Sequence, residues 1–203
     1  MEFEASYLGI PPANHSVDSQ GYWNAVLLKH DCMYRHNIMR INYTSYDVRR
    51  CDDVIHTGTS GRCNIMVLNP TALDAPDSVP GDRHPFWYAQ VLGIYHANVI
   101  YIGEGNLDYR PWQLEFLWVR WYELDEGNTH WSSRQLDHIS FPAIAQEHSF
   151  AFLDPSDVIR ACHLIPAFED GQENIGPSFH ATTRANWKSY VVNQWVTHFF
   201  LSF

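Results

Sequence analysis

The 203-residue sequence has no hydrophobic run that approaches the roughly 18 to 20 consecutive apolar residues a membrane-spanning helix needs. Its beginning, MEFEASYLGIPPANHS, is acidic and lacks the charged start and the apolar stretch of a secretory signal. These two absences predict an intracellular protein with no membrane partner.

Cysteine is scarce and dispersed. The four cysteines show neither a C-x-x-C spacing nor a close Cys/His pairing of the kind that holds zinc; they are Cys32, Cys51, Cys63 and Cys162. The twelve histidines are scattered in the same way, so we expect them in loops and on the surface. The sequence therefore predicts free thiols in a reducing compartment, and neither a metal nor a cofactor.

Familiar catalytic patterns are missing as well. The sequence contains no G-x-x-x-x-G-K-[ST] phosphate loop, no G-x-S-x-G nucleophile elbow and no H-E-x-x-H zinc motif. The carboxylate pairs Asp52/Asp53 and Asp125/Glu126 are adjacent in sequence, so in a strand the two side chains of a pair point to opposite faces. We expect no catalytic residues and no enzyme.

Positive charge is in the minority, with 13 Lys and Arg against 23 Asp and Glu and a formal net charge of −10. An acidic surface argues against non-specific binding to nucleic acid. Residues 29–50 are the exception, because five Lys or Arg stand there against two Asp. This basic segment is either a solvated face or a nucleic-acid site, and in the second case the binding residues are Arg35, Arg40, Arg49 and Arg50.

Aromatic side chains, by contrast, make up 15% of the chain, and two runs concentrate them: HPFWYAQVLGIYH (84–96) and LEFLWVRWYE (114–123). Both runs are rich in residues that favour strands. In the second run Leu117, Val119 and Trp121 share one face, and the other face carries Phe116, Trp118, Arg120 and Tyr122. Because this other face holds a charge and a phenol, we expect it to be the wet or ligand-facing side.

Two interpretations of these rings stay open. Trp and Tyr at strand spacing are typical of a folded core. Three or four rings that converge at the mouth of a barrel, with an acidic residue nearby, instead suit a methylated ammonium group, and each contact contributes roughly 0.5 to 2 kcal/mol. We expect Trp87 and Trp121 in the core, and we expect the partner-binding rings to be Tyr88, Trp118, Tyr122 and Trp131.

The stretch AFLDPSDVIRACHLIPAF predicts a single helical turn followed by a strand. Asp154 stands at the N-cap position of this turn and Pro155 at its first helical position. Short strands and long polar loops predict a mainly β fold, a bent SH3-like barrel, in residues 32–168. Residues 1–31 are expected to be an extended or poorly ordered lead-in, and residues 169–203 a loop and a C-terminal docking segment that contains a helix.

Six blocks of the sequence form a recognisable series between about residues 32 and 196: MYRHNIMRINYTSYDVRRCDD, NIMVLNP, HPFWYAQVLGIYHANVIYIG, LEFLWVRWYE, AFLDPSDVIRACHLIPAF and WKSYVVNQWV. In this order they resemble the C-terminal region of the large proteins encoded by fungal DNA transposons of the Plavaka type, in the Kyakuja-Dileera-Zisupton group. In that family the region follows an RNase H-like catalytic domain, which no part of this chain resembles. The resemblance implies a detached accessory domain.

Two features depart from the family pattern. The chain ends THFFLSF where the family continues into a charged stretch similar to DRDMFMRF, and Cys51 stands where the family tends to have a polar or acidic residue. The first departure implies a degenerate fragment. At the level of the fold, the layout of FWYAQVLGIYH, FLWVRWYE and LDPSDVIRACHLIP also resembles BAH domains, which are bent barrels that bind histone tails or nucleosomes.

These observations lead to one main hypothesis and two alternatives. The main hypothesis is a non-catalytic, nuclear binding domain of a transposon-derived protein, which docks a chromatin or protein partner such as a histone tail. The first alternative is a DNA-binding accessory domain of a transposase that uses the basic segment 29–50. The second is a degenerate fragment without a selected function.

Overall fold

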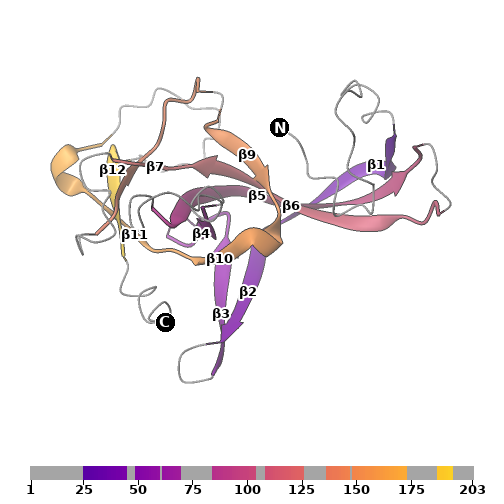
Figure 1. The fold of residues 1–203 in the computed structure, drawn as a ribbon, viewed down its shortest axis with the longest axis horizontal. Coiled ribbons are helices and arrows are strands. Elements are labelled where there is room, and N and C mark those ends of the chain that lie inside the picture. The colour runs from indigo at the N-terminus through magenta and orange to yellow at the C-terminus, as the bar shows by residue number, and fades with distance from the viewer. Residues whose placement is uncertain are drawn as a thin grey trace, which may run out of the picture. The chain divides into compact units, whose positions relative to one another are not determined.

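The computed structural model of the protein describes residues 25–44, 49–59, 61–69, 84–103, 108–125, 136–146, 148–172 and 187–193. The regular elements in these residues are strands and two single turns of 3-10 helix, which confirms the predicted mainly β fold. In chain order (Figure 1) they are β1 (Val26–His36), β2 (Ile38–Thr44), β3 (Arg50–His56), β4 (Asn64–Leu68), β5 (Phe86–Tyr101), β6 (Trp112–Trp121), β7 (Glu123–Leu124), β8 (His138–Ser140), β9 (Phe150–Leu153), η3 (Pro155–Asp157), β10 (Val158–Ala161), β11 (Leu164–Pro166), η4 (Phe168–Asp170) and β12 (Ser189–Val192).

The chain divides into two compact units, of which the smaller is Met1–Tyr34 with His96–Leu114. In this unit β1 pairs with β5, and the Ile102 backbone N donates to the Ala25 carbonyl at 2.7 Å. Strand β1 thus begins inside the segment 1–31 that we expected to be a lead-in, and residues 1–24 of that segment lie outside the described residues.

The larger unit, Arg35–Tyr95 with Glu115–Phe203, contains the main sheet, in which the strand order is β10-β4-β5-β6-β9. Its apolar residues alternate along the strands, so one face of the sheet is buried. As predicted, Leu117 and Val119 share this face, and neither is exposed to solvent. The first core consists of Ile55, Ile65, Val67, Ala89, Val91, Ile94, Leu117, Val119 and Val158.

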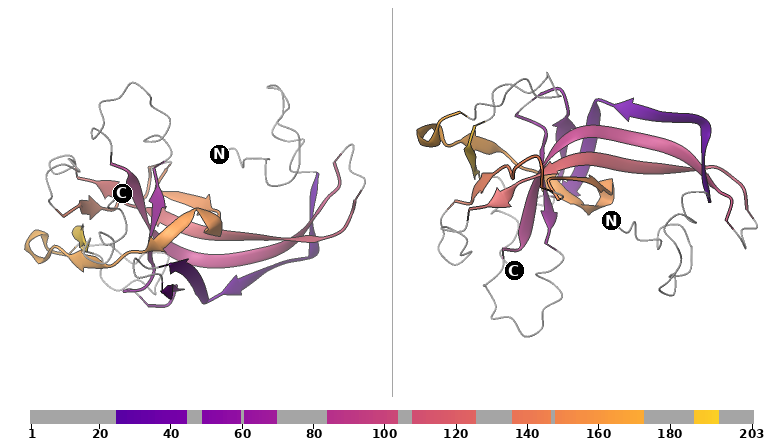
Figure 2. Two further views of the ribbon diagram at one scale, coloured as in Figure 1. Left: turned by 60° about the horizontal axis from the view of Figure 1, so that its bottom comes forward. Right: turned by 90° about the horizontal axis from the view of Figure 1, so that it is seen from above.

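The antiparallel hairpin of β2 and β3 covers part of this core and is fastened to β10 by a buried ion pair. The Arg160 Nε donates to the Asp53 Oδ2 at 3.1 Å, and the Ala161 backbone N donates to the same oxygen at 3.1 Å. The Arg160 guanidinium also lies 3.8 Å above the ring of Tyr43. Figure 2 shows the hairpin beside β10, and the ion pair joins segments more than a hundred positions apart in sequence.

A second sheet, with the strand order β11-β12-β8-β7, packs on the opposite face of β4 and β5. Met66 lies between Ile65 and Val67 in β4 and therefore points away from the first core. The second core consists of Met66, Phe86, Tyr88, Tyr122, Ile139, Cys162 and Val192. Because most of β4 is covered on both faces, its sequence NIMVL is a nearly continuous apolar run.

The local structure agrees with the sequence-based prediction at one turn and differs from it near the C-terminus. The helical turn at Pro155–Asp157 is confirmed, and the Asp154 carboxylate accepts a hydrogen bond from the Ser156 backbone N at 2.7 Å. The expected C-terminal helix is wrong for Ser189–Val192, which forms a strand between β11 and β8; its aromatic and β-branched side chains favour that pairing. Residues 194–203 of the expected helix lie outside the described residues. In the described part of the chain the strands form three sheets and no closed barrel.

Candidate functional site

The candidate site lies where β5 and the chain after β6 separate. At this point a hydrogen bond from the Tyr122 backbone N to the Tyr88 carbonyl, at 2.9 Å, joins them. Beyond it β7 pairs with β8 in the second sheet, while Trp87 remains paired with β4 in the main sheet. We call the space between Trp87–Tyr88 and Glu123–Asp125 the fork.

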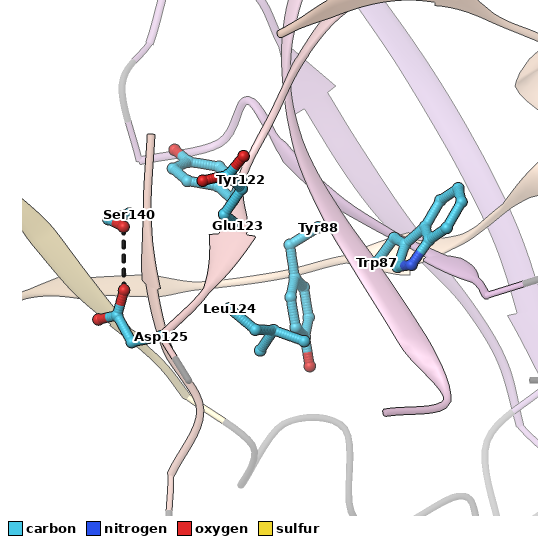
Figure 3. A pocket seen from close by; sticks show the side chains of 7 residues that line it. All are labelled: Trp87, Tyr88, Tyr122, Glu123, Leu124, Asp125 and Ser140. Carbon is cyan, nitrogen blue, oxygen red and sulfur yellow. Dashed lines mark hydrogen bonds between the residues drawn. The ribbon is translucent and has the colours of Figure 1, made fainter. Parts of the chain in front are cut away.

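The fork contains a pocket with a volume of about 630 Å³ (Figure 3). Three of its lining side chains are aromatic and two are carboxylates. The lining residues are Trp87, Tyr88, Tyr122, Glu123, Leu124, Asp125 and Ser140. Tyr88 and Tyr122 are buried, whereas the Trp87 side chain is 38% exposed and Glu123 is fully on the surface, so the pocket has an aromatic interior and an acidic rim.

The two tyrosines of the pocket are held from behind by hydrogen bonds. The Tyr88 hydroxyl donates to the Asp137 Oδ2 at 2.7 Å, and the Tyr122 hydroxyl donates to the Asn64 Oδ1 at 3.1 Å. Burial raises the pKa of both phenols well above 10, and for Tyr88 the charge of Asp137 raises it further. Both rings therefore stay neutral and fixed, and they form a buried aromatic lining in which the Tyr122 ring stacks on Phe141 with 4.2 Å between the centroids.

The acidic side of the pocket comes from the short strand β7 and the residue after it. The Asp125 Oδ1 accepts a hydrogen bond from the Ser140 hydroxyl at 3.0 Å, as the dashed line in Figure 3 marks. Glu123 is exposed beside it. The lining residues thus carry two carboxylates and neither lysine nor arginine, which makes the pocket attractive to a cation.

A buried pair of side chains, His84 and Asp137, helps to hold Tyr88 in the pocket wall. The His84 Nε2 lies 2.9 Å from the Asp137 Oδ2, and the His84 Nδ1 lies 2.8 Å from the Phe86 carbonyl oxygen. Burial lowers the pKa of His84, but the hydrogen bond and the charge of Asp137 outweigh it, so the pKa is raised above 6.5. Both ring nitrogens of His84 lie against protein atoms. His84 therefore positions the Asp137 carboxylate, which in turn accepts the hydrogen bond from the Tyr88 hydroxyl.

The structure brings together two of the four expected partner-binding rings. Tyr88 and Tyr122 line the same pocket. Trp118 lies outside its lining and faces Phe150, with 6.2 Å between the ring centroids, and Trp131 lies outside the described residues. The expectation that Trp87 lies in the core is wrong because it is exposed at the pocket, whereas Trp121 does pack against the first core.

The expectation of a wet face on β6 is wrong at Arg120 and Tyr122, since both are buried. The Arg120 guanidinium carbon lies 3.9 Å above the ring of Phe141, and its Nη2 donates to the Pro142 carbonyl at 3.3 Å. Cation–π attraction and this hydrogen bond compensate for the lost hydration of the guanidinium. The charged residue Arg120 therefore did not indicate which face of β6 is exposed to solvent.

Sequence reasoning missed the two carboxylates of the pocket. Glu123 and Asp125 are two positions apart, a spacing that puts both side chains on the same side of an extended chain. This spacing of two is the sequence signal that distinguishes them from adjacent pairs such as Asp52/Asp53. Ser140, which is distant in sequence and meets Asp125 through strand pairing, carried no such signal.

Two of the four arginines of the basic segment, Arg40 and Arg50, lie at separate positions along the hairpin. The Arg40 Nη1 forms an exposed ion pair with the Asp52 Oδ2 at 3.1 Å. Arg40 stands opposite Val54, and Arg50 stands opposite Thr44 at the other end of the hairpin, about 13 Å away at the usual rise per residue. Arg35 belongs to β1 and Arg49 precedes β3, and both are exposed.

Comparison with known proteins yielded no relatives: no family model, no curated protein and no solved structure matches this chain. Among the described residues, no group of three or more His, Cys, Asp or Glu side chains is placed to hold a metal ion. None of the described helices has the length and apolar character needed to cross a membrane. The pocket in the fork is therefore the basis for a functional argument.

Proposed function

We propose that this chain is a non-catalytic binding domain that docks a protein partner by receiving a positively charged side chain in the fork. The observation that carries the proposal is one pocket lined by Trp87, Tyr88 and Tyr122 and by the carboxylates of Glu123 and Asp125. Ring faces attract cations through their quadrupole, and carboxylates attract them through charge. A cation that left water for this pocket would therefore meet favourable groups on both sides.

The cation best suited to an aromatic pocket is a methylated ammonium group. Each methyl group spreads the positive charge and weakens hydration, so less solvation is lost when the group enters the pocket. Methylated lysines of histone tails present such a group on an exposed chain. The resemblance to BAH domains and to the accessory region of Plavaka-type transposon proteins supports a chromatin partner in the nucleus, and we include this in the proposal.

The nucleic-acid alternative has less support among the described residues. It requires a cluster of basic side chains that neutralises several phosphates at once. The hairpin instead places Arg40 and Arg50 at different ends and offsets the charge of Arg40 with Asp52. A degenerate fragment without a selected function remains the third hypothesis, and it predicts no selective ligand at all.

The test is a binding screen of the full chain, at two salt concentrations, against histone peptides with unmodified and methylated lysines and against a labelled DNA duplex. Calorimetry with the best peptide then compares the wild type with the variants Glu123→Gln and Asp125→Asn. Each should weaken binding roughly tenfold, which corresponds to about 1.4 kcal/mol. Glu169→Gln is the matched control, because it removes an exposed carboxylate of η4, outside the pocket lining, and should leave the affinity unchanged.

Three results would contradict the proposal. They are failure to capture any cationic peptide, equal affinity of wild type and both pocket variants, or equal losses in the pocket variants and the control. Capture of DNA that falls steeply with salt would instead move the function to the arginines of the basic segment.

A further inference from the structure

The edge of β7 is left without a second partner strand in the described part of the chain. On one side β7 pairs with β8, with Glu123 opposite Ser140 and Leu124 opposite Ile139. The Asp125 backbone N donates to the His138 carbonyl at 3.0 Å. In an antiparallel ladder, successive residues direct their backbone groups to alternate sides. Because Asp125 directs its backbone toward β8, the N–H and C=O of Leu124 point away from β8, toward the fork.

The opposite side of the fork is occupied by a side chain. The Tyr88 carbonyl accepts a hydrogen bond from the Tyr122 N–H. Phe86 is two residues before Tyr88 in β5, so its N–H and C=O point to the same side of the strand. In the described part of the chain the His84 side chain stands where β6 would continue: its Nδ1 lies 2.8 Å from the Phe86 oxygen and 3.2 Å from the Phe86 nitrogen, and it can bond one of these groups at a time. A side chain thus caps the β5 edge, and the β7 edge is the one that can receive another strand.

We propose that the fork binds its partner as an extended peptide, which adds a short strand to β7 at Leu124 and directs a cationic side chain to the carboxylates of Glu123 and Asp125 in the pocket. This inference rests on the proposed function and specifies its binding mode. The occupant follows from the chemistry of the edge. The backbone groups of Leu124 that point away from β8 match those of an extended chain, and the carboxylates on either side of Leu124 match a cationic side chain.

Strand addition has a definite consequence for specificity. The main-chain hydrogen bonds contribute affinity for any peptide sequence, whereas selectivity comes from the side chain that enters the pocket. The next side chains on either side of it point away, because side chains alternate along a strand. The domain should therefore tolerate most residues next to the cationic one, except proline at the position that donates to Leu124.

The experiment compares two probes on the full chain. One is N-acetyl-trimethyllysine N-methylamide, and the other is a capped pentapeptide with trimethyllysine between two alanines on each side. We expect the pentapeptide to bind at least tenfold more tightly, and methylation of one of its backbone nitrogens to abolish the gain. On binding of the pentapeptide, but not of the single amino acid, hydrogen exchange at the Leu124 amide should slow at least tenfold.

The outcomes separate this inference from the proposed function. Equal affinity of the two probes, or no change in exchange at Leu124, would overturn strand addition while leaving a pocket for a cation. Failure of both probes to bind would overturn both proposals. Since the N-methyl groups are on the peptide, none of these results depends on a protein variant that fails to fold.

Discussion

The ion pair between Asp53 and Arg160 offers a sharp test of how the hairpin is held. The Asp53→Ala variant removes a carboxylate that accepts hydrogen bonds from Arg160 and from the Ala161 backbone. The Asp53 and Arg160 side chains are only 16% and 7% exposed. The variant therefore leaves a guanidinium and an N–H buried without their acceptor, and such a loss costs about 3 to 5 kcal/mol. Because Asp53 keeps some contact with water, we expect the lower end of that range.

The neighbouring residue provides a matched control. Asp52 also pairs with an arginine across the hairpin, but the Arg40 and Asp52 side chains are 69% and 43% exposed. Exposed ion pairs contribute roughly 0.2 to 1 kcal/mol, so Asp52→Ala should have little effect. Asp53→Asn should fall between the two alanine variants, since its one carbonyl oxygen still accepts a hydrogen bond.

Urea unfolding followed by tryptophan fluorescence measures the difference. With an m-value of about 2 to 3 kcal/mol per M, the Asp53→Ala midpoint should fall by about 1 M, whereas the Asp52→Ala midpoint should scarcely move. Equal midpoints for the two alanine variants would refute the expectation that burial and the hydrogen bond from Ala161 make Asp53 the more important carboxylate.

Three further variants test other buried contacts. The folded-state pKa of His84 is raised, so its stabilising contribution is complete below about pH 6.5 and is lost as pH rises through the folded pKa; above about pH 6.5 the free energy of unfolding should therefore fall more in the wild type than in His84→Gln, as urea titrations at each pH will show. Tyr122→Phe removes the hydrogen bond to Asn64 and should cost about 1 to 3 kcal/mol in the same unfolding assay, and an unchanged midpoint would contradict this. Gly93→Ala places a methyl group where the Tyr95 ring lies, so thermal unfolding should occur at a lower temperature; an unchanged transition would mean that the ring moves aside freely.

The parts of the fold that could be predicted from sequence are those with local causes. Strand alternation correctly placed Leu117 and Val119 on one buried face, because the period of a strand is a property of its own backbone. The turn at Pro155–Asp157 was predicted from the capping carboxylate and the proline, which act within three residues. The alternation of side chains along a strand also has a limit as a predictor. It shows which residues share a face, but not whether another sheet covers that face.

That limit explains the errors at the pocket. Tyr122 and Arg120 are buried because a second sheet and Phe141 cover the face that we expected to be wet, and Trp87 is exposed because β7 departs from β5 beside it. The strand at Ser189–Val192 likewise depends on neighbours from two distant segments. None of these arrangements is a property of one stretch of sequence.

The sequence by itself determined the class of fold, the position of the aromatic strands and the acidic balance of the chain, because composition and short-range periodicity are local quantities. Only the tertiary structure decided which rings meet which carboxylates. Tyr88 and Asp125 come together because β6 leaves β5 at Tyr122 and the chain continues into a different sheet. The chemistry of the pocket depends on that long-range pairing, and long-range pairing is set by the packing of the whole larger unit.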